Sequence, residues 1–358
     1  MEIFYSDHYD LPLPSGHFFP MAKYRLLRER LMTLPSDVTW TDPPRIALEE
    51  LLLAHDPGYV ERVLGGAMSE AEIRRLGFPW SEALVERSLR SSGATLHACS
   101  AALREGLGVN LAGGTHHAFR DAAEGYCLFN DSAVAALALL DGGRVRRVLV
   151  VDTDVHQGNG TASILRDEPR AFTFSIHGAR NFPLRKETSD LDIALPDGTG
   201  DADYLLALER GLNEAFGRSA PDLVIHVSGA DPYHDDRIGK LALSKEGLVG
   251  RDEMVYSYCR RYSCPVAVSM AGGYARDVND TAAIHAATSI PTPTGTGDWA
   301  VNDRIRREGT ANLLAACRAE RVRRYVQQSV AMLNAASDAR AQTEDDPIAL
   351  PILRYYNG

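Results

Sequence analysis

The chain has 358 residues, of which 45% are hydrophobic and 24% charged, and its formal net charge is −10. This length suits one large α/β domain, or one domain with an extra segment. Nucleic-acid binding requires concentrated positive charge, so the acidic balance predicts no direct contact with nucleic acid. It is compatible with a basic substrate, although a high net charge also serves solubility alone.

The cysteine content and the apolar runs bear on the compartment. The cysteines are Cys99, Cys127, Cys259, Cys264 and Cys317. Their odd number and the lack of C-x-x-C spacing indicate neither a disulfide framework nor a thiolate zinc site. The first residues lack the features of a signal peptide, and no apolar run is long enough to cross a bilayer. We therefore expect a cytoplasmic protein without a membrane span.

Short apolar runs recur along the chain with helical stretches between them. The runs are residues 109–112, 148–151, 171–176, 223–227 and 265–270, and the helical stretches are residues 131–140, 201–216 and 248–262. Runs this short, rich in Val and Ile, are typical of central strands in a parallel sheet. The predicted fold class is α/β, with three layers and a central, mainly parallel sheet flanked by helices. Polar motifs follow the runs, and the carboxyl ends of parallel strands meet in one crevice.

The segment after residue 290 differs in composition. Residues 291–297 are rich in Pro, Thr and Gly and indicate a linker, residues 309–324 a helix, and residues 325–330 a strand. We therefore divide the chain into a domain of residues 1–290 and an appendage of residues 291–358.

Two carboxylates and one imidazole follow separate strands and suit a metal ion. Asp154 and His156, two residues apart after one run, would face the same side. Asp231 would add the third ligand from a neighbouring strand. Three protein ligands with an open position are typical of catalytic zinc, which lowers the pKa of water to about 7 and polarises a carbonyl. In isolation, an Asp-x-His pair is more often a loop cap.

Three further side chains suit proton transfer and oxyanion binding. His116 and His117 are adjacent in an apolar neighbourhood and could serve as base and acid beside an ion. Tyr274 follows two glycines at a strand end, where its phenol could donate to an oxyanion. Buried, hydrogen-bonded histidines and a tyrosine packed at a turn are the alternatives.

Together these motifs resemble the zinc-dependent histone deacetylases of the arginase–deacetylase fold. The matching segments are residues 113–118, 125–131, 152–160, 229–231 and 272–274. Their order and spacing fit across residues 1–290. The segment 156–160, His-Gln-Gly-Asn-Gly, is most similar to the class IV branch and its bacterial relatives, because class I members usually have a second Asp where Asn159 stands.

The resemblance implies roles for the polar residues. Asp154, His156 and Asp231 would hold zinc, although ferrous iron suits the same donors. His117 would be the base and later the acid, and Asn159 would orient it. His116 would be an electrostatic partner bonded to Asp152, and Tyr274 would donate to the oxyanion. An amide at Asn159 lacks a carboxylate's charge, which predicts a less basic His117 than in class I members.

The resemblance also implies a structural potassium ion and an acyl-lysine tunnel. The potassium positions are Asp152, Asp154, His156, Ser175 and Ile176, largely through main-chain oxygens. The tunnel positions are Gly125 with its flanking aromatics Tyr126 and Phe182. Ile238 stands where polyamine-specific members have a glutamate, which argues against a polyamine preference, although Asp235 and Asp236 are nearby.

The tail resembles a different family. Residues 302–333 are similar to the middle of an epimerase-type Rossmann domain but lack the glycine-rich phosphate loop and the Tyr-x-x-x-Lys pair. Without that loop there is no dinucleotide cradle, so we predict no redox activity.

These observations predict an amidohydrolase that removes acyl groups, from acetyl to fatty acyl, from the lysine of a protein or peptide. A small acylated amine such as an acetylpolyamine is an alternative substrate. An arginase-like ureohydrolase would require two bridging manganese ions and more Asp ligands. A catalytically silent reader of acyl-lysine would not require His117 and Tyr274.

Overall fold

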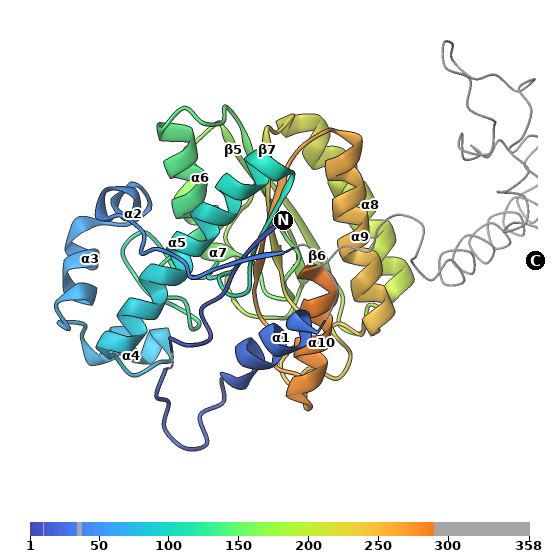
Figure 1. Ribbon diagram of the computed structural model, residues 1–358. Coiled ribbons are helices and arrows are strands. Elements are labelled where there is room, and N and C mark those ends of the chain that lie inside the picture. Colours follow the sequence, from blue (N-terminus) through green and yellow to red (C-terminus); the bar gives the residue numbers. More distant parts are fainter. Residues whose placement is uncertain (10, 34–37, 290–358) are drawn as a thin grey trace, which may run out of the picture. The chain divides into compact units, whose positions relative to one another are not determined.

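A computed structural model describes residues 1–9, 11–33 and 38–289 of the chain (Figure 1). The linker, helix and strand predicted within residues 291–358, and the epimerase resemblance, lie outside the described residues.

Eight strands form one parallel sheet in the order β2-β1-β3-β8-β7-β4-β5-β6. The strands are β1 Glu2–Phe4, β2 Thr39–Thr41, β3 Leu107–Asn110, β4 Val148–Asp152, β5 Ala171–Gly178, β6 Leu191–Leu195, β7 Leu223–Ser228 and β8 Val266–Met270. All the pairings between neighbours are parallel, so every strand ends at the same edge of the sheet.

Helices cover both faces of this sheet (Figure 1). They are α1 Ala22–Met32, α2 Leu48–Ala54, α3 Pro57–Leu64, α4 Glu70–Leu76, α5 Glu82–Glu105, α6 Asp131–Asp141, α7 Asn159–Leu165, α8 Asp201–Ser219, α9 Lys245–Arg261 and α10 Val278–Ser289. Side chains of α2 to α7 pack in one apolar cluster, and those of α1, α8, α9 and α10 pack in the other. The predicted α/β class with a central parallel sheet is confirmed.

Strand β4 shows why the central runs are mostly apolar. Val148 and Val150 belong to the cluster on one face, whereas Leu149 and Val151 belong to the cluster on the opposite face. Successive side chains of a strand point to opposite faces, so a strand covered on both sides is apolar at most positions.

Some boundaries differ from the prediction for local reasons. Strand β3 ends at Asn110 rather than residue 112, where the Asn110 side chain accepts a hydrogen bond from the Ala112 N–H (2.9 Å). Helix α9 begins at Lys245, three residues before the predicted start, because Ser244 caps it by accepting from the Gly247 N–H (2.9 Å).

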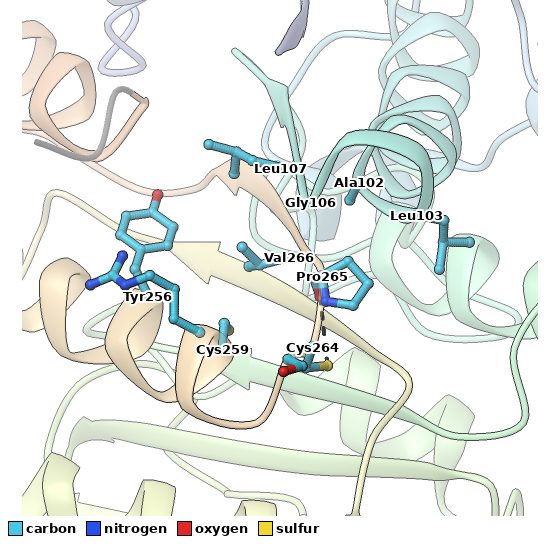
Figure 2. A pocket seen from close by; sticks show the side chains of 11 residues that line it. Ala102, Leu103, Gly106, Leu107, Tyr256, Cys259, Cys264, Pro265 and Val266 are labelled. Carbon is cyan, nitrogen blue, oxygen red and sulfur yellow. Dashed lines mark hydrogen bonds between the residues drawn. The ribbon is translucent and has the colours of Figure 1, made fainter. Parts of the chain in front are cut away.

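The two edges of the sheet differ in chemistry. At the edge where β3 and β8 begin, a cavity of about 460 Å³ lies between the ends of α5 and α9 (Figure 2). Its lining includes the thiols of Cys259 and Cys264 but neither a carboxylate nor an imidazole. The polar motifs instead gather at the opposite edge, where the strands end. Within the described part of the chain, no helix combines the length and apolarity needed to cross a membrane.

Candidate active site

Asp154, His156 and Asp231 converge at the carboxyl edge of the sheet. Each is buried, and one ligand atom from each lies within 4.8 Å of the other two. His156 Nδ1 lies 2.9 Å from Asp154 Oδ1 and 3.2 Å from Asp231 Oδ2. Strands β4 and β7 are neighbours, which brings the loops that follow them together. Because β4 ends at Asp152, Asp154 and His156 lie in a loop, and bends in that loop rather than strand alternation bring them together.

The surroundings of these side chains fit a divalent cation. Asp231 Oδ2 is buried and, apart from its 3.2 Å approach to His156 Nδ1, meets no hydrogen-bond donor, which is costly unless a cation satisfies it. Burial and the nearby Asp154 carboxylate raise the pKa of Asp231 to about 6, as expected for crowded carboxylates. A Cβ at Gly229 or Gly272 would collide with these carboxylate oxygens, so both glycines leave the space that the group requires.

Backbone donors fix the two carboxylates, and Asp231 Oδ2 is the oxygen that no backbone donor meets. Asp154 Oδ2 accepts from the Gly272 N–H (2.8 Å), and Asp231 Oδ1 accepts from the Val155 N–H (3.0 Å). These bonds orient the carboxyl groups in the way that outer hydrogen bonds orient metal ligands in general.

The adjacent histidines have different partners. His116 Nδ1 lies 2.7 Å from Asp152 Oδ2 at the end of β4, and His117 Nδ1 lies 2.6 Å from Asn159 Oδ1 at the start of α7. Their ring centroids are 4.1 Å apart. One imidazole therefore faces a carboxylate, and its neighbour faces a neutral amide.

The different partners shift the pKa values of the two rings in opposite directions. Burial lowers the pKa of His116, but the carboxylates of Asp152 and Asp154 outweigh burial and raise it to about 9. Burial, with the positive charges of His116 and His156, places the pKa of His117 well below 6.5. Near neutral pH, His116 is thus a cation and His117 is a neutral ring that can accept a proton.

Tyr274 is held in the site through its backbone. Its N–H donates to Asp236 Oδ2 (2.6 Å), and its carbonyl oxygen accepts from Arg237 Nε (3.1 Å). Its ring stacks on that of Phe18 with centroids 5.6 Å apart. Burial raises the pKa of the Tyr274 phenol well above 10, so the hydroxyl stays protonated and able to donate.

A cavity of about 470 Å³ opens onto these groups. It is lined by both histidines, Asp154, His156 and Tyr274, and by the four positions Gly125, Tyr126, Phe182 and Ile238. The Phe182 ring meets that of His117 edge to face, with centroids 4.9 Å apart. Aromatic walls leading to polar groups suit a methylene chain with an amide at its tip.

Several residues that support the site have no role that the sequence predicts. The buried Lys23 donates to the Ala271 carbonyl oxygen (3.0 Å), just before the glycines that lead to Tyr274. Asp131 accepts from the Gly114 N–H (3.0 Å) and so holds the loop before the histidines. Asp236 appears in the sequence only as a nearby acidic residue, and a lone Lys or Asp gives no signal of such contacts.

The chain belongs to the histone deacetylase family, because the histone deacetylase domain matches residues 17–290. It is a hydrolase of the deacetylase type, in a family whose members depend on a metal ion, typically zinc. The predicted resemblance is confirmed.

The individual relatives agree with this family. An uncharacterized protein from Picosynechococcus is 42% identical over 78% of this chain and 93% of its own length. Histone deacetylase 2 of Arabidopsis thaliana is 26% identical over 76% of this chain and 74% of its own. The crystal structure of acetylpolyamine aminohydrolase from Burkholderia pseudomallei has a TM-score of 0.68 at 22% identity, covering 80% of this chain and 97% of that one. At that identity, the structural likeness shows the fold alone.

Proposed function

We propose that this protein hydrolyses the amide of Nε-acyl-lysine in a protein or peptide, with zinc held by Asp154, His156 and Asp231. One observation supports the proposal most directly: the Asp-His-Asp group, the neutral ring of His117 and the phenol of Tyr274 adjoin one aromatic-walled cavity. A protein that only binds acyl-lysine would need neither a histidine without a carboxylate partner nor a buried tyrosine.

The side chains divide the work of amide hydrolysis. Zinc, when bound, would polarise the acyl carbonyl and increase the acidity of water. His117 Nε2 accepts a proton from the attacking water and later delivers it to the departing amine. The Tyr274 hydroxyl donates to the oxyanion that develops on the carbonyl oxygen. The cationic ring of His116 adds positive charge beside this oxyanion.

The charges along the cavity favour lysine over a polyamine. The acidic residues that line it are Asp154, which belongs to the metal group, and Glu124, which is bonded to Arg75. Ile238 offers an apolar surface, and the cationic side chains of Lys23 and Arg75 also line the cavity. A polyamine has further ammonium groups that would need free carboxylates, and like charges disfavour its binding.

Two other chemistries are less well supported. A ureohydrolase requires a bridging metal pair, and the described residues contain one three-residue group with metal-ligand geometry. An acetylpolyamine remains the second candidate substrate, since the similar structure from Burkholderia pseudomallei is an acetylpolyamine aminohydrolase.

We also propose the structural potassium ion at Asp152, Asp154, His156, Ser175 and Ile176. In support, strands β4 and β5 pair with Asp152 opposite Ser175, which places the main chains of both segments side by side. Main-chain and side-chain oxygens are the usual ligands of such hard cations.

A direct test compares substrates on metal-loaded protein. Fluorogenic lysine peptides with acetyl, octanoyl and myristoyl groups, and N-acetylspermidine, are assayed with and without a chelator. We expect chelator-sensitive turnover of at least one acyl-lysine and much weaker turnover of the polyamine. Preference for N-acetylspermidine would reject the substrate assignment, and turnover that survives complete metal removal would reject the mechanism.

A further inference from the structure

Glu124 lies behind His117, the proposed base, on the far side of Asn159. Its Oε2 accepts from Asn159 Nδ2 (2.8 Å), and its Oε1 accepts from Arg75 Nε (3.0 Å). Asn159 Oδ1 in turn lies 2.6 Å from His117 Nδ1. The four side chains form a line from the surface to the catalytic ring.

The backbone holds Glu124 in this place. Its N–H donates to the Cys127 carbonyl oxygen (3.1 Å), and the Cys127 N–H donates back to the Glu124 carbonyl oxygen (2.9 Å). The next N–H, that of Gly125, donates to the Arg75 carbonyl oxygen (3.2 Å). With only 19% of its side chain exposed, Glu124 is tied to both the cavity wall and the end of α4.

The line of hydrogen bonds has a direction. An ionised carboxylate only accepts, so Glu124 requires the NH₂ end of the Asn159 amide to face it. The oxygen end must then face His117, which makes Nδ1 of that ring the donor. The proton thus lies on Nδ1, and Nε2 has a free lone pair.

We infer that Glu124 is a positioning residue that selects the catalytically competent tautomer of His117 by fixing the orientation of the Asn159 amide. The inference rests on the proposed function, because it assumes that His117 is the base. It assigns to the Glu124–Arg75 pair a purpose beyond that of a partly exposed ion pair, which by itself contributes little to stability.

The near-isosteric variant Glu124→Gln distinguishes a positioning role of Glu124 from a role in the ion pair alone. Arg75 Nε only donates, so it retains the oxygen of the introduced amide and turns the introduced NH₂ group toward Asn159. Two NH₂ groups cannot face each other, so the Asn159 amide reverses and presents its own NH₂ to His117 Nδ1. That nitrogen must then accept, the proton moves to Nε2, and the base is lost.

The expected result is a fall in kcat of at least about tenfold with little change in KM, since a positioned base contributes about 10²–10⁴-fold. The control is Glu86→Gln, which removes an equally shielded carboxylate (25% exposed) bonded to Arg45 and Arg90, away from the cavity. It should leave kcat unchanged.

The double variant Glu124→Gln/Asn159→Asp provides the rescue. The introduced carboxylate accepts both from the introduced NH₂ group and from His117 Nδ1, which restores the first tautomer. We expect kcat at least about tenfold above that of Glu124→Gln alone. If position 124 served only the ion pair, the second substitution would give no recovery.

A spectroscopic readout makes the test independent of turnover. Ring ¹⁵N shifts of zinc-loaded protein, assigned to His117 by comparison with His117→Ala, report which nitrogen has the proton. We expect Nδ1–H in the wild type and Nε2–H in Glu124→Gln. An unchanged tautomer, or a loss of kcat under threefold in folded, zinc-loaded variant, overturns the inference. A wild type that shows Nδ1–H but cleaves no acyl-lysine instead counts against the proposed function.

Discussion

The role of Tyr274 gives the sharpest test of the proposed mechanism. Tyr274→Phe keeps the ring, which is 6% exposed, and its stacking on Phe18 at 5.6 Å. It also keeps the backbone hydrogen bond to Asp236 (2.6 Å). The only group removed is the hydroxyl, whose pKa burial raises well above 10, so that the wild-type enzyme retains this donor at any practical pH.

The size of the effect follows from the number of donors lost. Removing one donor to an oxyanion costs about 2.7–4 kcal/mol, or about 10²–10³ in kcat. The free energy of unfolding should change by less than about 1 kcal/mol, since the ring packing is kept. Both enzymes are loaded with zinc, and kcat on an acetyl-lysine peptide, metal content and unfolding are measured together.

Tyr59→Phe is the matched control for this experiment. The Tyr59 hydroxyl donates to the Leu128 carbonyl oxygen (2.6 Å) and lies outside the cavity lining, so its loss should lower stability by about 1 kcal/mol and spare kcat. If Tyr274→Phe with full metal content retained more than a tenth of wild-type kcat, the oxyanion role would have to be abandoned.

Three further outcomes are expected. Asp231→Asn should weaken zinc binding by more than about 100-fold, because changes outside the ligand set alone cost about 10–100-fold; retention of one zinc per chain after dialysis against a weak chelator would contradict this. Gly160→Ala should lower the free energy of unfolding in urea by about 1–3 kcal/mol, because its Cβ would collide with the Ala118 carbonyl oxygen. Gly217→Ala in α8 has open space around it and should raise the free energy of unfolding by about 0.5–1 kcal/mol. Equal effects of the two substitutions would refute the steric argument. Burial lowers the pKa of His55 from 6.5 to about 4, so the unfolded chain binds this proton first and stability falls as pH drops from 6.5 toward 4. Between pH 7 and pH 5 this group alone should lower the free energy of unfolding by about 2 kcal/mol. The free energy of unfolding of His55→Asn should therefore fall less steeply with pH than that of the wild type, and an equal slope would contradict the argument.

The sequence predicts the sheet and the placement of its motifs because burial on both faces favours largely apolar runs. Strand β4 is apolar up to Asp152, and β7 is apolar except for His226 and Ser228. The residues that follow the two strands lie together because the strands pair. By contrast, β1 and β2 have three residues each, too few for any periodicity to be recognised.

Close packing explains why α5 is not predicted. Its buried stretch includes Ser91, Ser92 and Gly93, which are small rather than apolar. A Cβ at Gly93 would collide with the Pro44 carbonyl oxygen, so the small residues are dictated by a neighbouring segment that the sequence does not identify. The same limit applies to Glu124, whose partner Asn159 is 35 residues away and reaches it only through the folded loop and α7.

The proposed mechanism gives different functions to the two identical side chains of the histidine pair. His116 and His117 are adjacent and both buried, so burial does not distinguish them. The difference comes from what each ring meets: the end of β4 supplies a carboxylate to His116, and the start of α7 supplies an amide to His117. The first ring therefore stays charged, while its positive charge helps to keep the second ring neutral. The proposed role requires that His117 remain unprotonated yet keep a defined tautomer. An amide oriented by a more distant carboxylate suits both requirements, because it would fix the proton on Nδ1 without placing a negative charge against the ring.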